Sequence, residues 1–262
     1  MRKFNIFISL LTSLMTSAQE RIDTDRPDQT ESAVLVPKKY FQGEFGFGRQ
    51  NSRTGDYTLA HPTFLLKYGL SKRFELRLEC TYFSEYIHLI PDSNTKTDLA
   101  PLEIGTKLAL FEEKGLLPKT SLIVHVGSSF RGSGPEVWPY YSSFRFTCQH
   151  SITEDIGLSY NFGAAKEEDG SALLYTFSPN FNIGKRWYGY IEAFGFGPTG
   201  SSANGHKWKH ALDAGFAYYI SNDTKIDVSG GFGLADNPMK NYFALGFSFR
   251  IPLNEKYRLA SK

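Results

Sequence analysis

Apolar and polar residues alternate along this chain with a period of two. The clearest stretch runs from Arg73 to Tyr82, where the apolar positions are Phe74, Leu76, Leu78, Cys80 and Tyr82. The positions between them are Glu75, Arg77, Glu79 and Thr81. On a β-strand, successive side chains point to opposite faces, so this stretch has one apolar face and one charged face. The pattern predicts an amphipathic strand.

Similar alternation recurs in seven other segments: Leu102–Leu110, Tyr140–Gln149, Ile156–Phe162, Leu173–Ile183, Trp208–Ile220, Lys225–Leu234 and Phe243–Ile251. Weaker alternation marks four more: Tyr40–Gln50, Leu59–Leu70, Thr120–Phe130 and Trp187–Gly197. We therefore expect about twelve strands, most of them roughly 10 to 12 residues long. A strand that crosses a membrane needs about 9–11 residues, whereas soluble strands average about 5–6. Strand length favours a membrane protein.

The connections between these strands alternate in length. The short ones are Leu70–Arg73, Ser151–Asp155, Gly184–Arg186 and Ser221–Asp223, with Glu112–Pro118 as a medium one in the same phase. The longer ones are Asn51–Thr58, Glu85–Asp98, Arg131–Val137, Ala165–Ala172, Pro198–Lys207 and Ala235–Asn241. Short turns at one end and long loops at the other are typical of outer-membrane barrels. We predict an all-β, transmembrane, antiparallel up-and-down barrel with both termini on the periplasmic side.

In such a barrel the apolar faces meet lipid and the polar faces line the lumen. The candidate lumen-lining charges are Glu75, Arg77, Glu79, Glu103, Lys107, Arg145, Lys209, Asp213, Lys225, Asp227 and Arg250, together with Glu44, Lys67 and Glu192. Their signs are mixed, so pairing across the lumen would narrow or block it. Aromatics near the strand ends, including Phe74, Trp187, Tyr188, Tyr219 and Phe247, are expected to form the periplasmic-side girdle. A soluble β-sandwich is the alternative.

The N-terminus predicts export. Arg2 and Lys3 precede an apolar run, Phe4–Leu14, and small residues follow at 16–18, which is the layout of a signal peptide cleaved after residue 18. The division expected is a signal peptide (1–18), a periplasmic segment (19–39), a barrel (40–251) and a tail (252–262). No later apolar run reaches the length of a helical span. The expected location is the outer membrane of a Gram-negative-type envelope, in contact with its lipid.

Composition narrows the function classes. The formal net charge is only +2, so no strongly basic field points to nucleic acid. The two cysteines, Cys80 and Cys148, each lie in the apolar phase of a strand and are interpreted as lipid-facing residues, not as a disulfide pair. The oligomeric state is left open.

The segment Ile22–Ser32 is dense in carboxylates around one arginine. Its notable residues are Asp23, Asp25, Arg26, Pro27, Asp28 and Glu31. Carboxylate oxygens are ligands that Ca²⁺ prefers, but the glycine and terminal glutamate of a calcium loop are absent. The favoured interpretation is a structural segment folded into the periplasmic mouth and paired with lumen charges. No metal or cofactor is expected.

This segment (TDRPD-Q-TES), followed by alternating strands with a YGLSKRFELRL hairpin, resembles a family of bacterial outer-membrane barrels described as transporters of the phenol-degradation meta pathway. The resemblance covers essentially the whole chain after the signal peptide. It implies a membrane barrel that transports small, aromatic or hydrophobic compounds, and it brings no catalytic residues. The tail after residue 251 departs from barrels that end on an aromatic residue.

Catalytic motifs are weak. The histidines are His61, His88, His125, His150, His206 and His210, and no Gly-x-Ser-x-Gly motif accompanies them. His206 and His210 would lie about 13 Å apart on a strand, too far for one metal. The leading hypothesis is an outer-membrane channel or transporter for small solutes. The alternatives are a closed structural or binding barrel acting through its outer loops, and a lipid-modifying enzyme that uses His125.

Overall fold

The computed structural model describes residues 21–88, 93–128, 140–167, 170–199 and 207–253. The expected signal peptide, the loop at 131–137 and His206 lie outside these ranges. Described strands are β1 (Tyr40–Ser52), β2 (Tyr57–Gly69), β3 (Phe74–His88), β4 (Ser93–Leu99), β5 (Leu102–Phe111), β6 (Lys119–Ser128), β7 (Tyr140–Ser151), β8 (Ile156–Glu167), β9 (Gly170–Ile183), β10 (Trp187–Pro198), β11 (Lys209–Ser221), β12 (Thr224–Gly233) and β13 (Met239–Pro252). None of the described residues forms a helix long and apolar enough to cross a bilayer.

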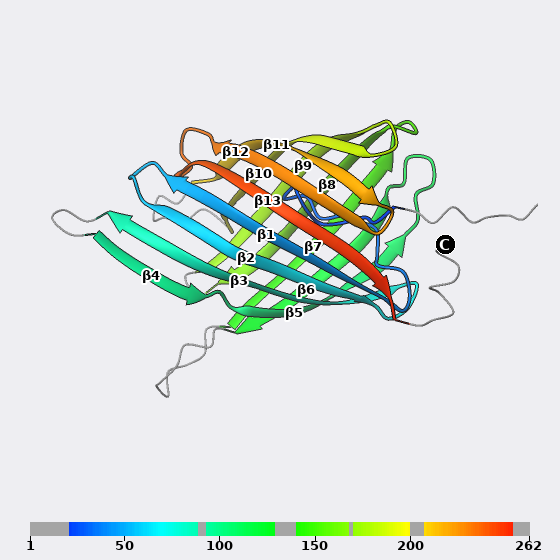
Figure 1. Cartoon of the computed structure of the whole chain (residues 1–262), viewed down its shortest axis with the longest axis horizontal. Coiled ribbons are helices and arrows are strands. Elements are labelled where there is room, and N and C mark those ends of the chain that lie inside the picture. The colour runs from blue at the N-terminus through cyan, green and yellow to red at the C-terminus, as the bar shows by residue number, and fades with distance from the viewer. Residues whose placement is uncertain (1–20, 89–92, 129–139, 168–169, 200–206, 254–262) are drawn as a thin grey trace, which may run out of the picture.

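The strands form one closed antiparallel sheet (Figure 1). β1 pairs with β2 on one side and with β13 on the other, and β2 also pairs with β3. From β5 to β13 each strand pairs with the next along the chain, and β5 pairs with β3. The ring therefore contains twelve strands, which confirms the predicted transmembrane up-and-down barrel. Tyr40 pairs with Pro252, so the two ends of the barrel sequence meet at the short-turn end.

The additional strand, β4, continues the line of β5. Both pair with β3: Leu99 of β4 lies opposite Tyr82, and Glu103 of β5 lies opposite Glu79. Pro101 separates the two halves because proline has no N–H to donate to a ladder. The predicted loop Glu85–Asp98 is therefore wrong over most of its length. In that region the outer end of β3 pairs with the whole of β4.

The two faces of the sheet have opposite chemistry. Large apolar side chains such as Ile104 (60% exposed), Val126 (59%) and Ile191 (59%) lie on the outside. Ionisable side chains such as Glu75 and Lys107 are 0% exposed and lie inside. A soluble protein buries the first kind and exposes the second. The inverted distribution requires a hydrocarbon solvent around the barrel, and a closed ring leaves no unpaired strand edge in that solvent.

Two smaller expectations were wrong, and a third was right only in part. The loop predicted at Ala165–Ala172 is shorter, since β8 extends to Glu167 and β9 begins at Gly170. Cys80 and Cys148 are free and occupy the outward phase, but neighbouring groups cover them to 2% and 6% exposure. Tyr188 and Tyr219 do not belong to the girdle, because both have the inward phase and line the space at the short-turn end of the lumen.

Tyr219 has the inward phase of β11 and is 9% exposed, and the Arg21 guanidinium lies over its ring, 4.5 Å from the ring centre. Trp187, in contrast, is 49% exposed on the outside, as expected of a girdle residue. In the turn between β9 and β10, Gly184 has a φ of 61°, a conformation that glycine adopts without strain.

Candidate functional site: the lumen and its plug segment

Residues 21–39 run inside the barrel at the short-turn end, and we call them the plug segment. The segment is anchored at both ends by backbone contacts. The Ile22 amide donates to Asn222 O at 2.6 Å, and the Lys39 amide donates to Gly69 O at 2.7 Å. Between these points the apolar side chains of Ile22, Ala33 and Val36 are 1–4% exposed. The segment therefore packs as part of the folded protein.

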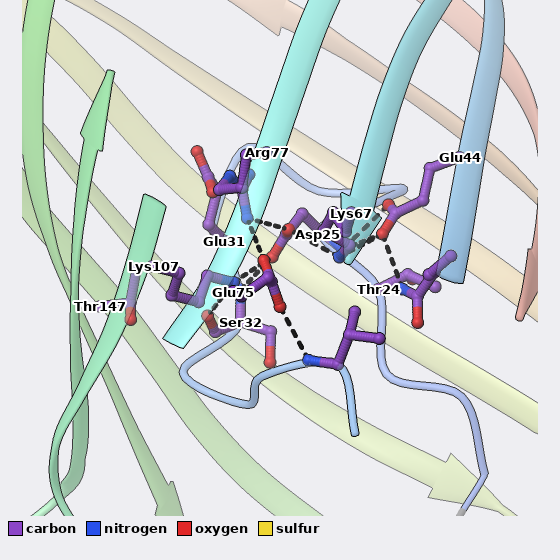
Figure 2. A network of polar contacts seen from close by, with 12 residues as sticks. Thr24, Asp25, Glu31, Ser32, Glu44, Lys67, Glu75, Arg77, Lys107 and Thr147 are labelled. Carbon is purple, nitrogen blue, oxygen red and sulfur yellow. Dashed lines mark hydrogen bonds and ion pairs between the residues drawn. The ribbon is translucent and has the colours of Figure 1, made fainter. Parts of the chain in front are cut away.

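Asp25 is the centre of a buried ionic cluster (Figure 2). Its Oδ2 lies 2.8 Å from Lys67 Nζ and 2.9 Å from Arg77 Nη1, while its Oδ1 lies 3.1 Å from Lys107 Nζ. The Ser32 amide also donates to Oδ1, at 2.9 Å. The three cations come from β2, β3 and β5, so one plug carboxylate joins three neighbouring strands.

Glu31 extends this cluster. Its Oε2 lies 2.6 Å from Arg77 Nη2, and its Oε1 lies 3.3 Å from Arg145 Nη1 on β7. Lys67 also pairs with Glu44, and Arg77 also pairs with Glu75 at 3.1 Å. The cluster contains four cations and four carboxylates, a balanced set that consists of Lys67, Arg77, Lys107, Arg145, Asp25, Glu31, Glu44 and Glu75.

Wall carboxylates also accept hydrogen bonds from the plug backbone. Glu44 accepts from the amides of Asp25 (3.0 Å) and Arg26 (3.2 Å). Glu75 accepts from the Val36 amide at 2.7 Å. A strand-free backbone buried inside a barrel needs such partners, since each unpaired buried amide costs about 1–3 kcal/mol.

On the opposite wall, Glu192 of β10 performs the same task. It accepts from the Gln29 amide at 2.8 Å and from the Thr30 hydroxyl, and Thr30 also contacts Thr176. Neutral groups complete the attachment: Asn161 accepts from the Glu31 amide at 2.7 Å. The plug segment is therefore bonded to walls on both sides of the lumen.

Arg26 lies in a notch between β1 and β13. Its Nη2 is 3.2 Å from Asp227 Oδ1 and 3.2 Å from Leu245 O. The notch exists because Gly46 and Gly246 face each other in the β1–β13 register. A Cβ on Gly46 would lie 2.2 Å from Arg26 Nη1, and one on Gly246 would lie 2.4 Å from Arg26 Nε. Glycine at both positions is what allows the guanidinium to approach the wall.

The plug carboxylates have opposite pKa shifts. Burial alone would raise the pKa of Asp25, but attraction to Lys107, Lys67 and Arg77 outweighs it and holds that pKa well below its usual value. The pKa of Glu31 is lowered in the same way by Arg77 and Arg145. Burial raises the pKa of Asp28 to about 8, because Lys225 offsets only part of the cost of desolvation. Asp25 and Glu31 are thus held ionised, whereas Asp28 is held protonated near neutral pH.

Cavities occupy the lumen on the side of the plug segment that faces the long loops. Three of them, of about 470, 270 and 280 Å³, share Gln29 of the plug as a lining residue. Phe194 and Phe196 line both the largest cavity and that of 280 Å³. On the short-turn side, a space of only about 60 Å³ remains, lined in part by Asp28, Tyr188 and Lys225. Within the described residues, the barrel has its larger cavities on the long-loop side of the plug segment and a much smaller one on the short-turn side.

The candidate lumen charges divide into two groups by burial, and members of both groups contact the plug segment. Buried inside the barrel are Glu75, Arg77, Lys107, Asp213, Lys225, Asp227 and Arg250. Glu79, Glu103, Arg145 and Lys209 are half-buried. The candidates that contact the plug segment directly are Glu75, Arg77, Lys107, Arg145, Lys225 and Asp227. Arg250 instead bonds Asp223 at 2.8 Å, and Lys209 lies 5.2 Å from the Phe196 ring centre.

Sequence reasoning missed the neutral partners of the plug segment. Ser121 donates to Ala33 O at 2.7 Å, Gln42 donates to Asp23 O at 2.7 Å, and Ser178 bonds Asp28 at 3.2 Å. These residues share the inward phase with the charges. That phase is the sequence signal that could have identified them.

The acidic residues of the plug segment do not gather around one point. Asp25 and Glu31 face the cations of β2–β7, whereas Asp28 contacts Ser178 of β9. Among the described residues, one group has metal-binding spacing: Glu79, Glu103 and His125, whose ligand atoms lie within 4.8 Å of one another. However, Arg77 Nε donates to His125 Nε2 at 3.1 Å. That bond fixes the proton on Nδ1, the nitrogen 3.6 Å from Glu103, so this histidine has no lone pair aimed at the group.

The comparisons with known proteins agree with this architecture. The family model described as "Putative MetA-pathway of phenol degradation" matches residues 24–251. This chain belongs to that family. The match begins at Thr24 inside the plug segment and ends at Ile251 of β13, so it covers plug and barrel together. No curated protein matches the sequence.

Two solved porin structures have a similar fold. The NanC porin in a rhombohedral crystal form has a TM-score of 0.51 at 10% identity, over 80% of this chain and 100% of the porin chain. The KdgM porin in complex with disordered oligogalacturonate has a TM-score of 0.50 at 11% identity, over 79% and 98%. The CymD monoaromatic hydrocarbon channel has a TM-score of 0.45 at 7% identity, over 83% and 89%. At these identities the first two structures show the fold, which is that of an outer-membrane β-barrel. The third has too low a TM-score to show more.

Proposed function

We propose that this member of the family is an outer-membrane channel for small solutes, and that the conformation described here is its closed state. The observation that carries the proposal is the uneven filling of the lumen. A cavity of about 470 Å³ lies beyond the plug segment, and only about 60 Å³ remains on its other side. A barrel that served only as a rigid support would not need such a hollow. The short-turn end, with the plug segment, then faces the periplasm.

The lining favours small solutes with an apolar part. Phe194, Phe196 and Met239 line the largest cavity together with polar groups such as Gln29 and Tyr242. Phe196 is 42% exposed although its phase on β10 is inward, so its ring is open to the hollow. Apolar surface with a few polar groups is typical of small-molecule sites. Small aromatic or hydrophobic compounds fit this lining.

The experiment is liposome swelling with solutes of graded size and charge. The wild-type barrel is compared with a full-length double variant, Asp25→Asn with Glu31→Gln, which neutralises both plug carboxylates of the ionic cluster. We expect liposomes with the double variant to swell faster than those with the wild type, and only with solutes below a certain size. The control is Asp236→Asn, which breaks an exposed pair with Lys207 at 3.5 Å. If the folded double variant admits no solute and conducts no ions, the channel proposal fails.

One observation favours the second candidate, a permanently closed binding or structural barrel. The plug segment is fixed by buried ion pairs and backbone bonds, not by a few surface contacts. The same swelling experiment decides between them. A closed barrel stays impermeable in the double variant and still shows the heat-modifiable electrophoretic mobility of a folded barrel.

An enzymatic function has less support. His125 is 5% exposed, and its ring nitrogens lie beside Arg77 and Glu103. A general base in a hydrolase needs a free nitrogen directed at a nucleophile. Hydrolysis of a lipid substrate that disappears in His125→Ala would establish this function.

A further inference from the structure

Arg26 lines the spaces on both sides of the plug segment. It contributes to the cavity of about 470 Å³, to that of about 270 Å³ and to the 60 Å³ space at the short-turn end. It is the one residue common to the lining of these three spaces. A path through the lumen along these cavities therefore passes the Arg26 side chain.

The attachments of the plug segment differ in strength around its circumference. Toward β2–β7, Asp25 has three cations and a backbone amide as partners. Toward β12 and β13, Arg26 Nη2 bonds Asp227 and Leu245 O at 3.2 Å each. Arg26 Nε and Asp227 Oδ2, both buried, have no partner among the described protein atoms. The Arg26 side chain is thus held by fewer bonds than the Asp25 side chain, so its movement breaks fewer bonds.

The wall behind Arg26 also offers room. From the notch toward the long loops, the first inward positions of β1 and β13 are Gly46, Gly48, Ala244 and Gly246, none with a side chain larger than a methyl group. When the guanidinium leaves the notch, no bulky side chain of these two strands fills the space. On the neighbouring strands β2, β3 and β5, in contrast, the long side chains of Lys67, Arg77 and Lys107 reach into the lumen and bind Asp25.

We propose that Arg26 and Asp227 form the selectivity gate of the channel: solutes cross between the plug segment and the β1–β13 wall when Arg26 swings out of its glycine notch. The proposal rests on the channel function proposed above and specifies its path. Asp25 and Glu31 keep the plug segment attached to β2–β7 while the gate moves. In this mechanism the backbone of the plug segment stays in place and only the Arg26 side chain moves.

The gate has a chemical signature because its two members carry opposite charges. Rings and pairs of charged side chains at a constriction set the ion preference of a pore. Removing Arg26 leaves the Asp227 carboxylate beside the path and favours cations. Removing the charge of Asp227 leaves Arg26 and Lys225 and favours anions. A plug that is merely loosened would shift the preference in the same direction for both changes.

The experiment records conductance and reversal potential across planar bilayers in a KCl gradient, using full-length Arg26→Ala and Asp227→Asn. Arg26→Ala removes the two bonds to the wall, and we expect roughly tenfold more frequent opening or higher conductance, the ratio that corresponds to about 1.4 kcal/mol. The reversal potential should move toward cation selectivity in Arg26→Ala and toward anion selectivity in Asp227→Asn. The control Arg21→Ala alters a plug residue that lines none of these cavities and bonds Asn182 at 2.9 Å.

The outcomes separate the gate from the channel. Opposite shifts in the two variants, with Arg21→Ala like the wild type, support the gate. Equal shifts, or no change in Arg26→Ala while Asp25→Asn with Glu31→Gln conducts, overturn the gate but leave the channel function standing. If no folded variant conducts, including that double variant, both proposals fall. Folding of each variant is checked by its electrophoretic heat-modifiability.

Discussion

Replacing Asp25 with asparagine tests whether charge holds the plug segment in the lumen. Asparagine keeps the size of the side chain and can still accept the bond from the Ser32 amide. The change removes one of four carboxylates from a cluster with four cations, so Lys67, Arg77 and Lys107 retain an uncompensated positive charge. Asp25 is 7% exposed, so water compensates little of this loss.

Removing one partner of a buried ion pair typically costs about 3–5 kcal/mol. Because 1.36 kcal/mol corresponds to a factor of ten, the plug segment should undock roughly a hundredfold to several thousandfold more often. The barrel itself should persist, since its strand ladders do not involve Asp25. The expected effect is therefore local: the plug segment opens while the strands stay protected.

Amide hydrogen exchange in detergent measures this directly. The informative amides are those of Arg26 and Val36, because their acceptors, Glu44 and Glu75, are unchanged by the substitution. Both should exchange faster in Asp25→Asn, while amides in β9 and β10 keep their wild-type rates. Asp236→Asn, in an exposed pair worth at most about 1 kcal/mol, serves as the control. Unchanged exchange at Arg26 and Val36 would show that the ionic cluster is not what holds the segment.

Three further predictions concern the same segment. Docking of the plug segment should weaken as pH rises from about 4 toward 8, because the docked state raises the pKa of Asp28 to about 8 and so binds its proton more tightly than the undocked state. Asp28→Asn should abolish this pH dependence in the exchange assay. Gly46→Ala should expel Arg26 and raise ion leakage, whereas Gly48→Ala, whose nearest contact would be 3.3 Å away, should not. Thr30→Val leaves Glu192 with one plug partner fewer and should destabilise docking by about 1–3 kcal/mol, seen as faster exchange at Gln29; a wild-type rate there would contradict it.

The barrel could be predicted because its sheet is a single closed layer. In such a layer the phase of a residue decides its solvent, so alternation such as Phe74–Glu75–Leu76 specifies lipid or lumen directly. Where the strands leave the membrane, that rule no longer applies. In β4, Lys96 is exposed and pairs with the half-buried Asp98 at 3.3 Å, and these polar residues resemble a loop in the sequence. Tyr219 was misassigned because its residue type was given more weight than its phase.

The contacts of the plug segment could not be predicted in detail. Lys107 lies 82 positions from Asp25 in the sequence, and Asp227 lies 201 positions from Arg26. Which charges meet depends on strand register and on the depth at which the segment lies, and neither leaves a local pattern. The composition of the segment did indicate pairing with lumen charges. It did not indicate the glycine notch, since Gly46 and Gly246 have no meaning apart from their register.

The glycine notch also orders the assembly of the protein. One of its glycines comes from the first strand and the other from the last, about two hundred residues later. That junction is the slowest kind of contact to form, because the entropy of closing so long a loop must be lost before any bond rewards it. Until β1 and β13 pair, Arg26 has no notch to enter. Docking of the N-terminus is therefore a late folding event that reports completion of the ring, and translation of the whole barrel must precede it.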